Sequence, residues 1–211
     1  MNYIENIYIC LAAPFLIAVL CVKKRARIVL LFMLAGMTAC IVSSYISTFI
    51  AGVHGMSPQS ASLETAPLVE EIIKLLPIVF CMTVLNSDKD TIVMGVLMTA
   101  IGFATFENVC YLAQNGAGGV VLLLIRGFGA GAMHVVCGII MGTGLVYVWK
   151  SGWLRIAGTV GLLALSITFH ATYNILISQD GIPAFVGSVL PVMTAVAVGV
   201  FTKRILHVTE N

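Results

Sequence analysis

Two adjacent glutamates and a lysine interrupt an apolar stretch of the chain. The stretch reads "PLVEEIIKLLPIVF" over residues 67–80 and holds Glu70, Glu71 and Lys74. On a helix, Lys74 lies four and three positions after the two glutamates, so its ammonium can reach either carboxylate. The glutamates project about 100° apart around the helix axis. We therefore expect one glutamate to face a polar site and the other to reach a partner, with a purely structural ion pair as the alternative.

Four more ionisable residues occur inside later apolar stretches, namely Glu107, Arg126, His134 and His170. A carboxylate beside a histidine can activate water as a general base, while a histidinium, amide or guanidinium stabilises the resulting oxyanion. Arg126 is expected mainly to neutralise a glutamate, and His134 is open between a core hydrogen bond and a role in a site. Asn174 follows His170 by four positions in "FHATYN", so it is expected to orient the imidazole or to bind a substrate carbonyl.

The same residue types raise the question of a metal. Two histidines and a glutamate can hold Zn²⁺ with a fourth position open for water, and His134, His170 and Glu71 are the candidates. The chain has no H-E-x-x-H sequence, because His134 is followed by "VVCG". The spacing therefore leaves open whether a zinc ion is bound.

The composition of the whole chain defines the setting of these residues. Of its 211 residues, 60% are hydrophobic and 9% are charged, whereas soluble domains have about 25% charged residues. So few charges exclude a soluble globular protein and indicate a polytopic membrane protein whose immediate surroundings are a lipid bilayer. The net charge of +2 gives no reason to expect a nucleic-acid partner.

Seven apolar stretches divide the chain, and most match the roughly 20 residues that a helix needs to cross a bilayer. Each stretch is continuously apolar rather than alternating, which favours helices over a barrel. We therefore predict an all-α transmembrane bundle of about seven spans, forming one integral-membrane domain over residues 1–211. The predicted spans are 4–22, 28–50, 68–85, 91–113, 120–149, 156–178 and 183–202.

The basic residues between these stretches predict an orientation. With seven spans, all nine fall on one side, and the loops 51–67, 114–119 and 179–182 on the other side contain no lysine or arginine. The positive-inside rule then places the N-terminus outside and the C-terminus inside. The nine residues are Lys23, Lys24, Arg25, Arg27, Lys89, Lys150, Arg155, Lys203 and Arg204.

This orientation puts the intramembrane charges at a common depth. A lone charged residue at a helix centre costs about 2.5–3.5 kcal/mol on insertion scales, so such residues should meet one another or water. They come from four spans and lie in the outer half of the membrane, with His134 nearer the middle. One water-accessible cavity that opens to the outside would explain their shared level.

Two local patterns give further expectations. Thr65 and Pro67 are typical of a helix start, which would place the glutamates near the positive end of the helix dipole. The polar loop 51–67 before it is expected either to lie over the cavity as a gate or to act as a plain connector.

Small residues in the fifth span form two pairs spaced four apart, Gly127 with Gly131 and Gly138 with Gly142. Such pairs are typical of helix–helix contacts in membranes, so both are expected to be packing faces. Asn108 is expected to support the site or simply to bond a neighbouring helix.

Four short motifs carry a resemblance to a known family. They are "EEIIK" (70–74), "GFATFEN" (102–108), "RGFGAGAMH" (126–134) and "HATYN" (170–174), in this order on spans three to six, over about residues 68–178. Together they resemble the PrsW-type intramembrane proteases, which are distant relatives of the CAAX-processing and bacteriocin-processing membrane proteases.

The resemblance implies a function and a place. It implies a multi-pass protease of the bacterial plasma membrane that makes the site-one, extracytoplasmic cut in a single-span anti-sigma factor during stress signalling. A site-two protease would then act on the product. Whether the water is activated by a glutamate or by a metal stays open.

The resemblance also implies roles for the polar residues. Glu70, Glu71, Glu107 and His170 are the catalytic candidates, and between the paired glutamates we expect Glu71 to be the base. The supporting candidates are Lys74, Arg126, His134, Asn108 and Asn174.

Two other classes of function remain. In a proton- or ion-coupled transporter, the same glutamates and His170 would form a path, but a carrier needs polar groups toward both sides. The inner halves of the spans carry almost none, and inverted repeats are not evident. An inactive immunity or scaffolding protein would keep the motifs without turnover, and changing Glu71 would then leave its function intact.

Overall fold

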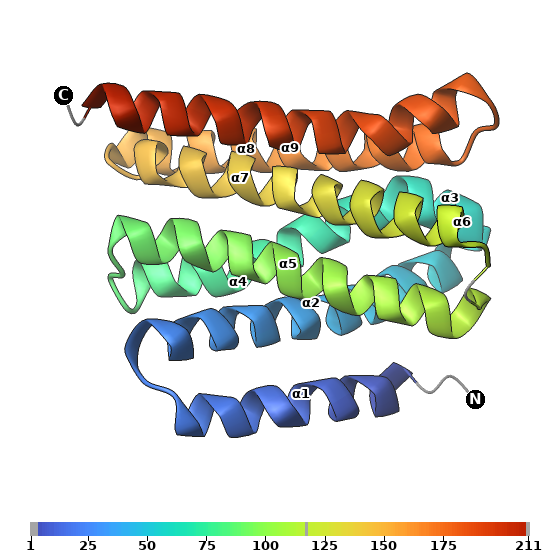
Figure 1. The fold of residues 1–211 in the computed structure, drawn as a ribbon, viewed down its shortest axis with the longest axis horizontal. Helices are drawn as coiled ribbons and strands as arrows, with labels where there is room; N and C mark the ends of the chain where they lie inside the picture. Colours follow the sequence, from blue (N-terminus) through green and yellow to red (C-terminus); the bar gives the residue numbers. More distant parts are fainter. Residues whose placement is uncertain (1–3, 117, 210–211) are drawn as a thin grey trace.

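The computed structural model describes residues 4–116 and 118–209, with side chains described as far as residue 199. All regular structure in these residues is helical, and the long helices run back and forth along one direction (Figure 1). They are α1 (Ile4–Cys21), α2 (Lys24–His54), α4 (Ala66–Thr83), α5 (Lys89–Asn115), α7 (Gly131–Val148), α8 (Gly152–Ile177) and α9 (Ile182–Thr209). Short pieces complete the path: α3 (Pro58–Ser60) and the π-helix η1 (Ala61–Thr65) lead into α4, and α6 (Val120–Leu124) and the π-helix η2 (Ile125–Ala130) lead into α7.

The prediction of an all-α polytopic bundle is confirmed. Among the described residues, six helical segments are long and apolar enough to cross a membrane, with α6, η2 and α7 forming one of them. The third predicted span is the helix α4, which packs against α2, α5 and α8 within the bundle. Its sequence differs from those of the six segments, because three charged residues, Glu70, Glu71 and Lys74, interrupt its 18 residues.

The connections alternate between the two ends of the bundle. Those joining α1 to α2, α4 to α5 and α7 to α8 lie at the end where the chain finishes (Figure 1). This end carries Lys23, Lys24, Lys89, Lys150 and Arg155 and is called the basic end below. The other end, called the non-basic end, has the connections from α2 to α3, α5 to α6 and α8 to α9.

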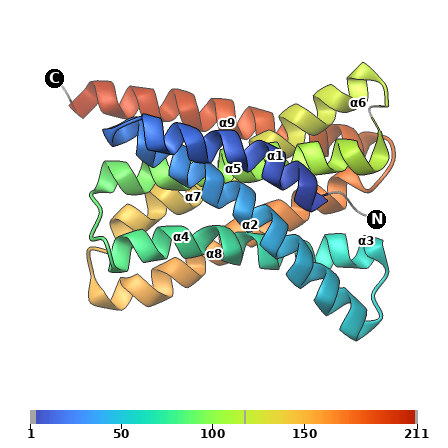
Figure 2. The ribbon, with the colours of Figure 1, turned by 90° about the horizontal axis from the view of Figure 1, so that it is seen from below.

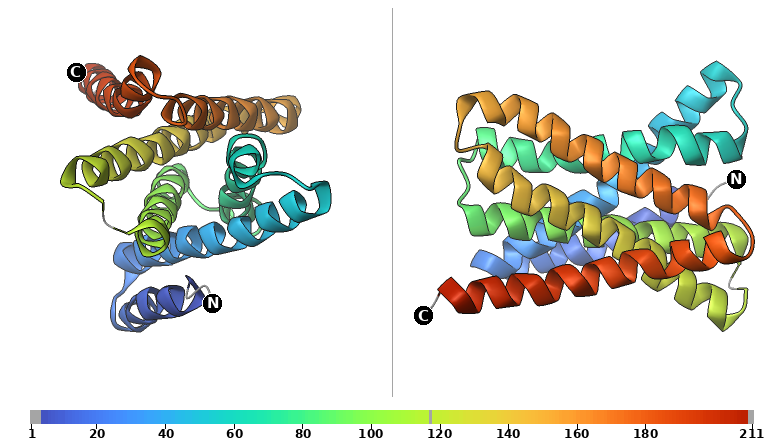
Figure 3. Two further views of the ribbon diagram at one scale, coloured as in Figure 1. Left: turned by 90° about the vertical axis from the view of Figure 1, so that its right-hand side faces the viewer. Right: turned by 90° about the horizontal axis from the view of Figure 1, so that it is seen from above.

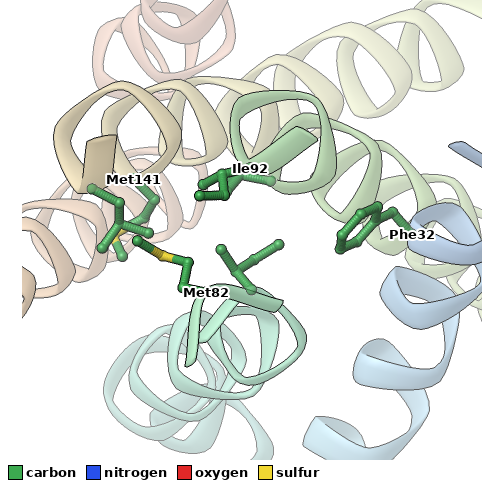
Figure 4. Packing of buried hydrophobic residues seen from close by; sticks show 7 residues of the cluster. Phe32, Met82, Ile92 and Met141 are labelled. Atoms are coloured by element: carbon green, nitrogen blue, oxygen red, sulfur yellow. The ribbon is translucent and has the colours of Figure 1, made fainter. Parts of the chain in front are cut away.

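Side chains from four helices pack together at the basic end. Phe32 of α2, Met82 of α4, Ile92 of α5 and Met141 of α7 face one another in this cluster (Figure 4). The cluster therefore joins α2 to three of the helices on which the polar residues lie, α4, α5 and α7.

Viewed along the helices, α1 and α9 lie at opposite edges of the bundle and the other long helices lie between them (Figure 3, left).

The connector from α2 to α4 differs from the prediction. Gly55, with φ of 61°, ends α2, and the chain is helical again from Pro58 without a break into α4. Figure 2 shows α3 beside the end of α2 at the non-basic end. Helix α4 begins at Ala66, with Thr65 at the cap position and Pro67 in its first turn, as the sequence predicted, but it directly continues the helical segment η1. Glu70 and Glu71 lie beyond the first turn of α4. A dipole effect confined to the first turn therefore does not reach them.

Candidate active site

A continuous chain of hydrogen bonds joins the buried polar residues of four helices. The Lys74 ammonium donates to Oε1 of Glu71 at 2.6 Å and contacts Nδ1 of His134 at 2.9 Å. Because an ammonium can only donate, Nδ1 accepts and the Nε2–H of a neutral His134 donates to Oε2 of Glu107 at 2.8 Å. Arg126 then donates to the other oxygen of Glu107 at 2.7 Å. Arg126 thus neutralises a glutamate, as expected.

His170 extends this network from α8. Its Nδ1 lies 2.8 Å from Oε1 of Glu71 and donates to that carboxylate. The His170 ring stands nearly perpendicular to that of His134, with the ring centres 5.1 Å apart. Nε2 of His170 lies 3.8 Å from Oε2 of Glu70, which is too far for a direct hydrogen bond. In the neutral ring, this Nε2 has a free lone pair that faces the carboxylate.

The paired glutamates have different surroundings. Glu71 is 4% exposed and is held by Lys74 and His170. The Glu70 side chain is 15% exposed and lines a cavity of about 880 Å³ at the non-basic end. Its Oε2 is buried and has no hydrogen-bond partner among the described residues. The geometry therefore favours Glu70, rather than the expected Glu71, as the carboxylate that meets a substrate.

Local structure explains how the side chains converge. Glu71 and Lys74 share a face of α4 because they are three residues apart. Arg126 lies in the π-helix η2, and π-bulges are frequent at functional sites.

Phe103, which the sequence analysis missed, is fully buried with its ring 4.7 Å from the Lys74 ammonium. Its position four residues before Glu107 on α5 was an available signal, since both lie on one helix face.

The connector forms one wall of the cavity that Glu70 lines. Met56, Pro58 and Ser62 face the cavity together with a row of serines on α2. Asn174 donates to the carbonyl of Ser62 at 3.0 Å, so its amide ties α8 to the connector instead of orienting His170. Of the two alternatives for loop 51–67, the structure favours a covering segment over a plain connector.

The two asparagines are predicted site residues that lie away from the hydrogen-bonded network. Asn174 holds the connector, as described above. Asn108 lines a different cavity, and its Oδ1 is buried without a partner among the described residues. All the other predicted site residues belong to the network or, in the case of Glu70, lie beside it.

A comparison with models of protein families assigns the chain to a family. Residues 24–201 match the model described as PrsW family intramembrane metalloprotease. The chain belongs to the PrsW family. No curated protein and no solved structure matches it. With this family and its apolar helices, the chain is a multi-pass membrane hydrolase, an intramembrane endopeptidase.

The PrsW family is described as metallo-type, so we tested whether this site suits a metal. One ligand atom each from Glu70, His134 and His170 lies within 4.8 Å of the others. Two histidines and a carboxylate are the ligand set of many catalytic zinc sites. The predicted set had Glu71, but this carboxylate is bound to Lys74 and to Nδ1 of His170.

The surroundings of the two histidines also suit a metal. Metal-binding histidines usually donate their second nitrogen to a carboxylate, and here Glu71 pairs with His170 and Glu107 with His134. Nε2 of His170 and Oε2 of Glu70 would both be satisfied by a shared cation. Since Lys74 contacts Nδ1 of His134, a metal bound at that nitrogen would replace the lysine there. When the metal takes the place of the lysine at this nitrogen, the donors from Glu70, His134 and His170 fit zinc.

Beneath the network, toward the basic end, the interior of this PrsW protein is nearly filled. A void of about 20 Å³ lies between Lys74 and Met141, which is room for about one water molecule. Beyond it lies the apolar cluster of Figure 4. A coupled carrier needs access from both sides, so this packing disfavours the transporter alternative.

Proposed function

We propose that the enzyme cuts a single-span membrane protein near the extracytoplasmic face, with Glu70 as the carboxylate that meets the reacting water. The observation that carries this proposal is the Glu70 side chain, which lines a large cavity and whose unpaired oxygen lies beside His170. The cavity opens at the non-basic end, which the positive-inside rule places outside. A substrate segment leaving the bilayer on that side would reach Glu70.

Each residue of the network has a part in this proposal. Oε2 of Glu70 accepts a proton from the attacking water, and Nε2 of His170 faces the same point. Glu71 fixes the orientation of His170 through Nδ1. Arg126 holds Glu107, which fixes His134 through Nε2.

The donors that would hold a zinc ion are Glu70, His134 and His170. A bound zinc would act as a Lewis acid that polarises the scissile carbonyl. Glu70 is required in both versions of the reaction, as proton acceptor or as ligand. Its removal is therefore the first test.

The substrate class is also a proposal, and it rests on the family resemblance. We infer a bacterial plasma-membrane enzyme that makes the site-one cut in an anti-sigma factor. The shortened product would pass to a site-two protease. An extracytoplasmic site fits this order, because the first cut is made outside the membrane core.

The test is co-expression with tagged single-span anti-sigma factors from the same genome, followed by immunoblotting. Wild type should yield a shorter fragment, and Glu70→Gln and His170→Ala should not, at equal membrane abundance. Glu64→Gln is the control, because Glu64 is an exposed glutamate of the connector, in η1 just before the helix that carries Glu70. Fragments that persist with Glu70→Gln would refute the assigned role.

A second measurement addresses the metal and the remaining alternative. Purified wild type should retain zinc that His134→Ala with His170→Ala does not, and chelation should stop cleavage. Proton-coupled flux through the purified protein that depends on Glu70 would instead support a carrier.

A further inference from the structure

The two glycine pairs of the fifth span have different surroundings. A Cβ on Gly138 would lie 2.9 Å from the Cβ of Ala100, and one on Gly142 would lie 3.3 Å from that of Val96. This pair is the packing face against α5 that the sequence predicted. A Cβ on Gly127 or Gly131 would meet no atom within 4 Å. The second pair therefore packs against nothing in the described part of the chain.

Gly127 and Gly131 line a surface cavity of about 360 Å³, called the furrow below. Its walls are α5, with Ala104 and Asn108, and α9, with Val192. Figure 1 shows α5, α7 and α9 side by side on the near face, and both outer helices pack on α7. The floor is free of side chains at its two glycines, so a helix backbone can approach closely there.

The furrow and the catalytic cavity are both neighbours of a third, apolar cavity that shares lining residues with each. Phe128 lines both the furrow and an apolar cavity of about 800 Å³ between η2 and α9. Arg126 and Tyr111 line both this apolar cavity and the cavity of Glu70. Arg126 also holds Glu107. A segment that extended from the furrow in this direction would meet Arg126 before the reacting groups.

We propose that the furrow docks the transmembrane helix of the substrate, so that the segment beyond that helix enters the catalytic cavity past Arg126. This inference rests on the proposed function. The α9 residues that line the two apolar cavities extend from Ala184 to Val196, about 18 Å along a helix. This length is more than half of the roughly 30 Å hydrocarbon core.

A polypeptide suits the furrow better than a lipid acyl chain does. Asn108 lines the furrow, and its amide oxygen is buried without a partner in the described residues; a buried polar group without a hydrogen bond is costly. A helix that unwinds near its end frees backbone N–H groups that can donate to this oxygen. An acyl chain has no donor.

The glycine floor provides a direct test. Gly131→Leu should leave the fold intact, because a Cβ there meets no described atom, the residue lines the furrow of about 360 Å³, and leucine has the higher helix propensity. Gly161→Leu is the matched control, since Gly161 is an exposed helical glycine of α8 that also has no atom within 4 Å of its Cβ position. Each variant would be assayed on a single-span substrate that wild type cleaves, and on a soluble peptide that has the scissile segment but no span.

We expect Gly131→Leu to lose at least about tenfold in kcat/KM on the single-span substrate, equivalent to about 1.4 kcal/mol. It should cleave the soluble peptide as wild type does, and Gly161→Leu should match wild type on both. Equal cleavage of the single-span substrate by both variants would overturn the inference. If wild type cleaved none of the single-span candidates from which this substrate is chosen, the proposed function would be refuted instead.

A loss on both substrates would be resolved by crosslinking. Photo-reactive benzoylphenylalanine at position 131 or 161 would be placed in the Glu70→Gln background, which is expected to bind the substrate without cutting it. Crosslinks to the substrate span at position 131 and not at position 161 would support docking. The absence of crosslinks at position 131, or equal crosslinks at both, would overturn it.

Discussion

The basic and non-basic ends of the bundle are built from the same helices but differ in their interiors. At the basic end, α2, α4, α5 and α7 meet through an apolar cluster that includes Ile78 and Leu145. At the non-basic end, α2, α4 and α5 line a cavity of about 880 Å³, to which Glu70 and Glu107 contribute. The hydrogen-bonded network lies between the two regions. The cluster holds the helices together, so the opposite end can stay open around charged groups.

Helix α4 shows the difference within one element. Its first half carries Glu70, Glu71 and Lys74, and its second half carries Ile78 and Met82 in the cluster. We therefore expect changes in the first half to affect chemistry or charge balance, and changes in the second half to affect stability alone. The following variants test this division.

The largest effect is expected at Glu70, in a comparison with its neighbour Glu71. Glu70→Gln should lower kcat by about 10²–10⁴-fold, the usual contribution of an acid–base group, while the thermal midpoint in detergent stays near that of wild type. Glu71→Gln should lower both activity and the midpoint, because it leaves the buried Lys74 without its carboxylate. If the two variants behaved alike, the separate roles assigned to them would be wrong.

Removal of the buried ammonium should give the next largest effect. Lys74→Met leaves Glu71 charged and without its 2.6 Å ion pair, which typically costs about 3–5 kcal/mol of unfolding free energy. Urea or thermal unfolding in micelles would measure the loss, with Lys89→Met at the exposed basic end as control. Combining Lys74→Met with Glu71→Gln should restore part of the stability. A double variant less stable than Lys74→Met would contradict a charge-balance role for the lysine.

The sequence predicted the network because charges inside apolar spans are costly. Glu107, Arg126 and His170 were placed at one level by the span boundaries alone, and the structure joins them through Glu71, Lys74 and His134. The different environments of Glu70 and Glu71 could not be predicted. Their positions differ by about 100° around α4, and the packing of α4 against α2, α5 and α8 decides which one faces the cavity.

The connector had a local signal that the sequence analysis overlooked. The side chain of Ser57 accepts from the backbone N–H of Ser60 at 3.1 Å, and Pro58 follows it at the first helical position. A serine cap followed by proline is a recognised helix start, stronger than the pair Thr65 and Pro67. The two glycine pairs had no such signal. Their spacing is identical, and only the neighbours of α7 distinguish a packed pair from an open one.

A smaller effect, on stability alone, is expected within the basic end. Ile78 is 1% exposed in the apolar cluster, and Ile78→Ala should cost about 2–5 kcal/mol. The kcat per folded molecule should match that of wild type. Leu76→Ala is the matched control, because Leu76 is on the same helix and is 56% exposed. A selective loss of kcat in folded Ile78→Ala would show that the cluster also positions the network.

The smallest effect is expected where the connector is fastened over the cavity. Asn174→Ala removes the hydrogen bond to the Ser62 carbonyl, and such bonds between membrane helices contribute about 0.6 kcal/mol. Global stability should hardly change, but hydrogen exchange over residues 58–65 should be faster, because the connector loses its tie to α8. Ser178→Ala is a suitable control, since Ser178 follows α8 directly and its hydroxyl makes only local bonds, to the Ile175 carbonyl and from the Gln179 amide, among those described. Faster exchange together with an altered KM would identify the connector as a wall that substrates pass. An unchanged exchange rate would mean that η1 is held by its packing on α2 and α8 and not by this hydrogen bond.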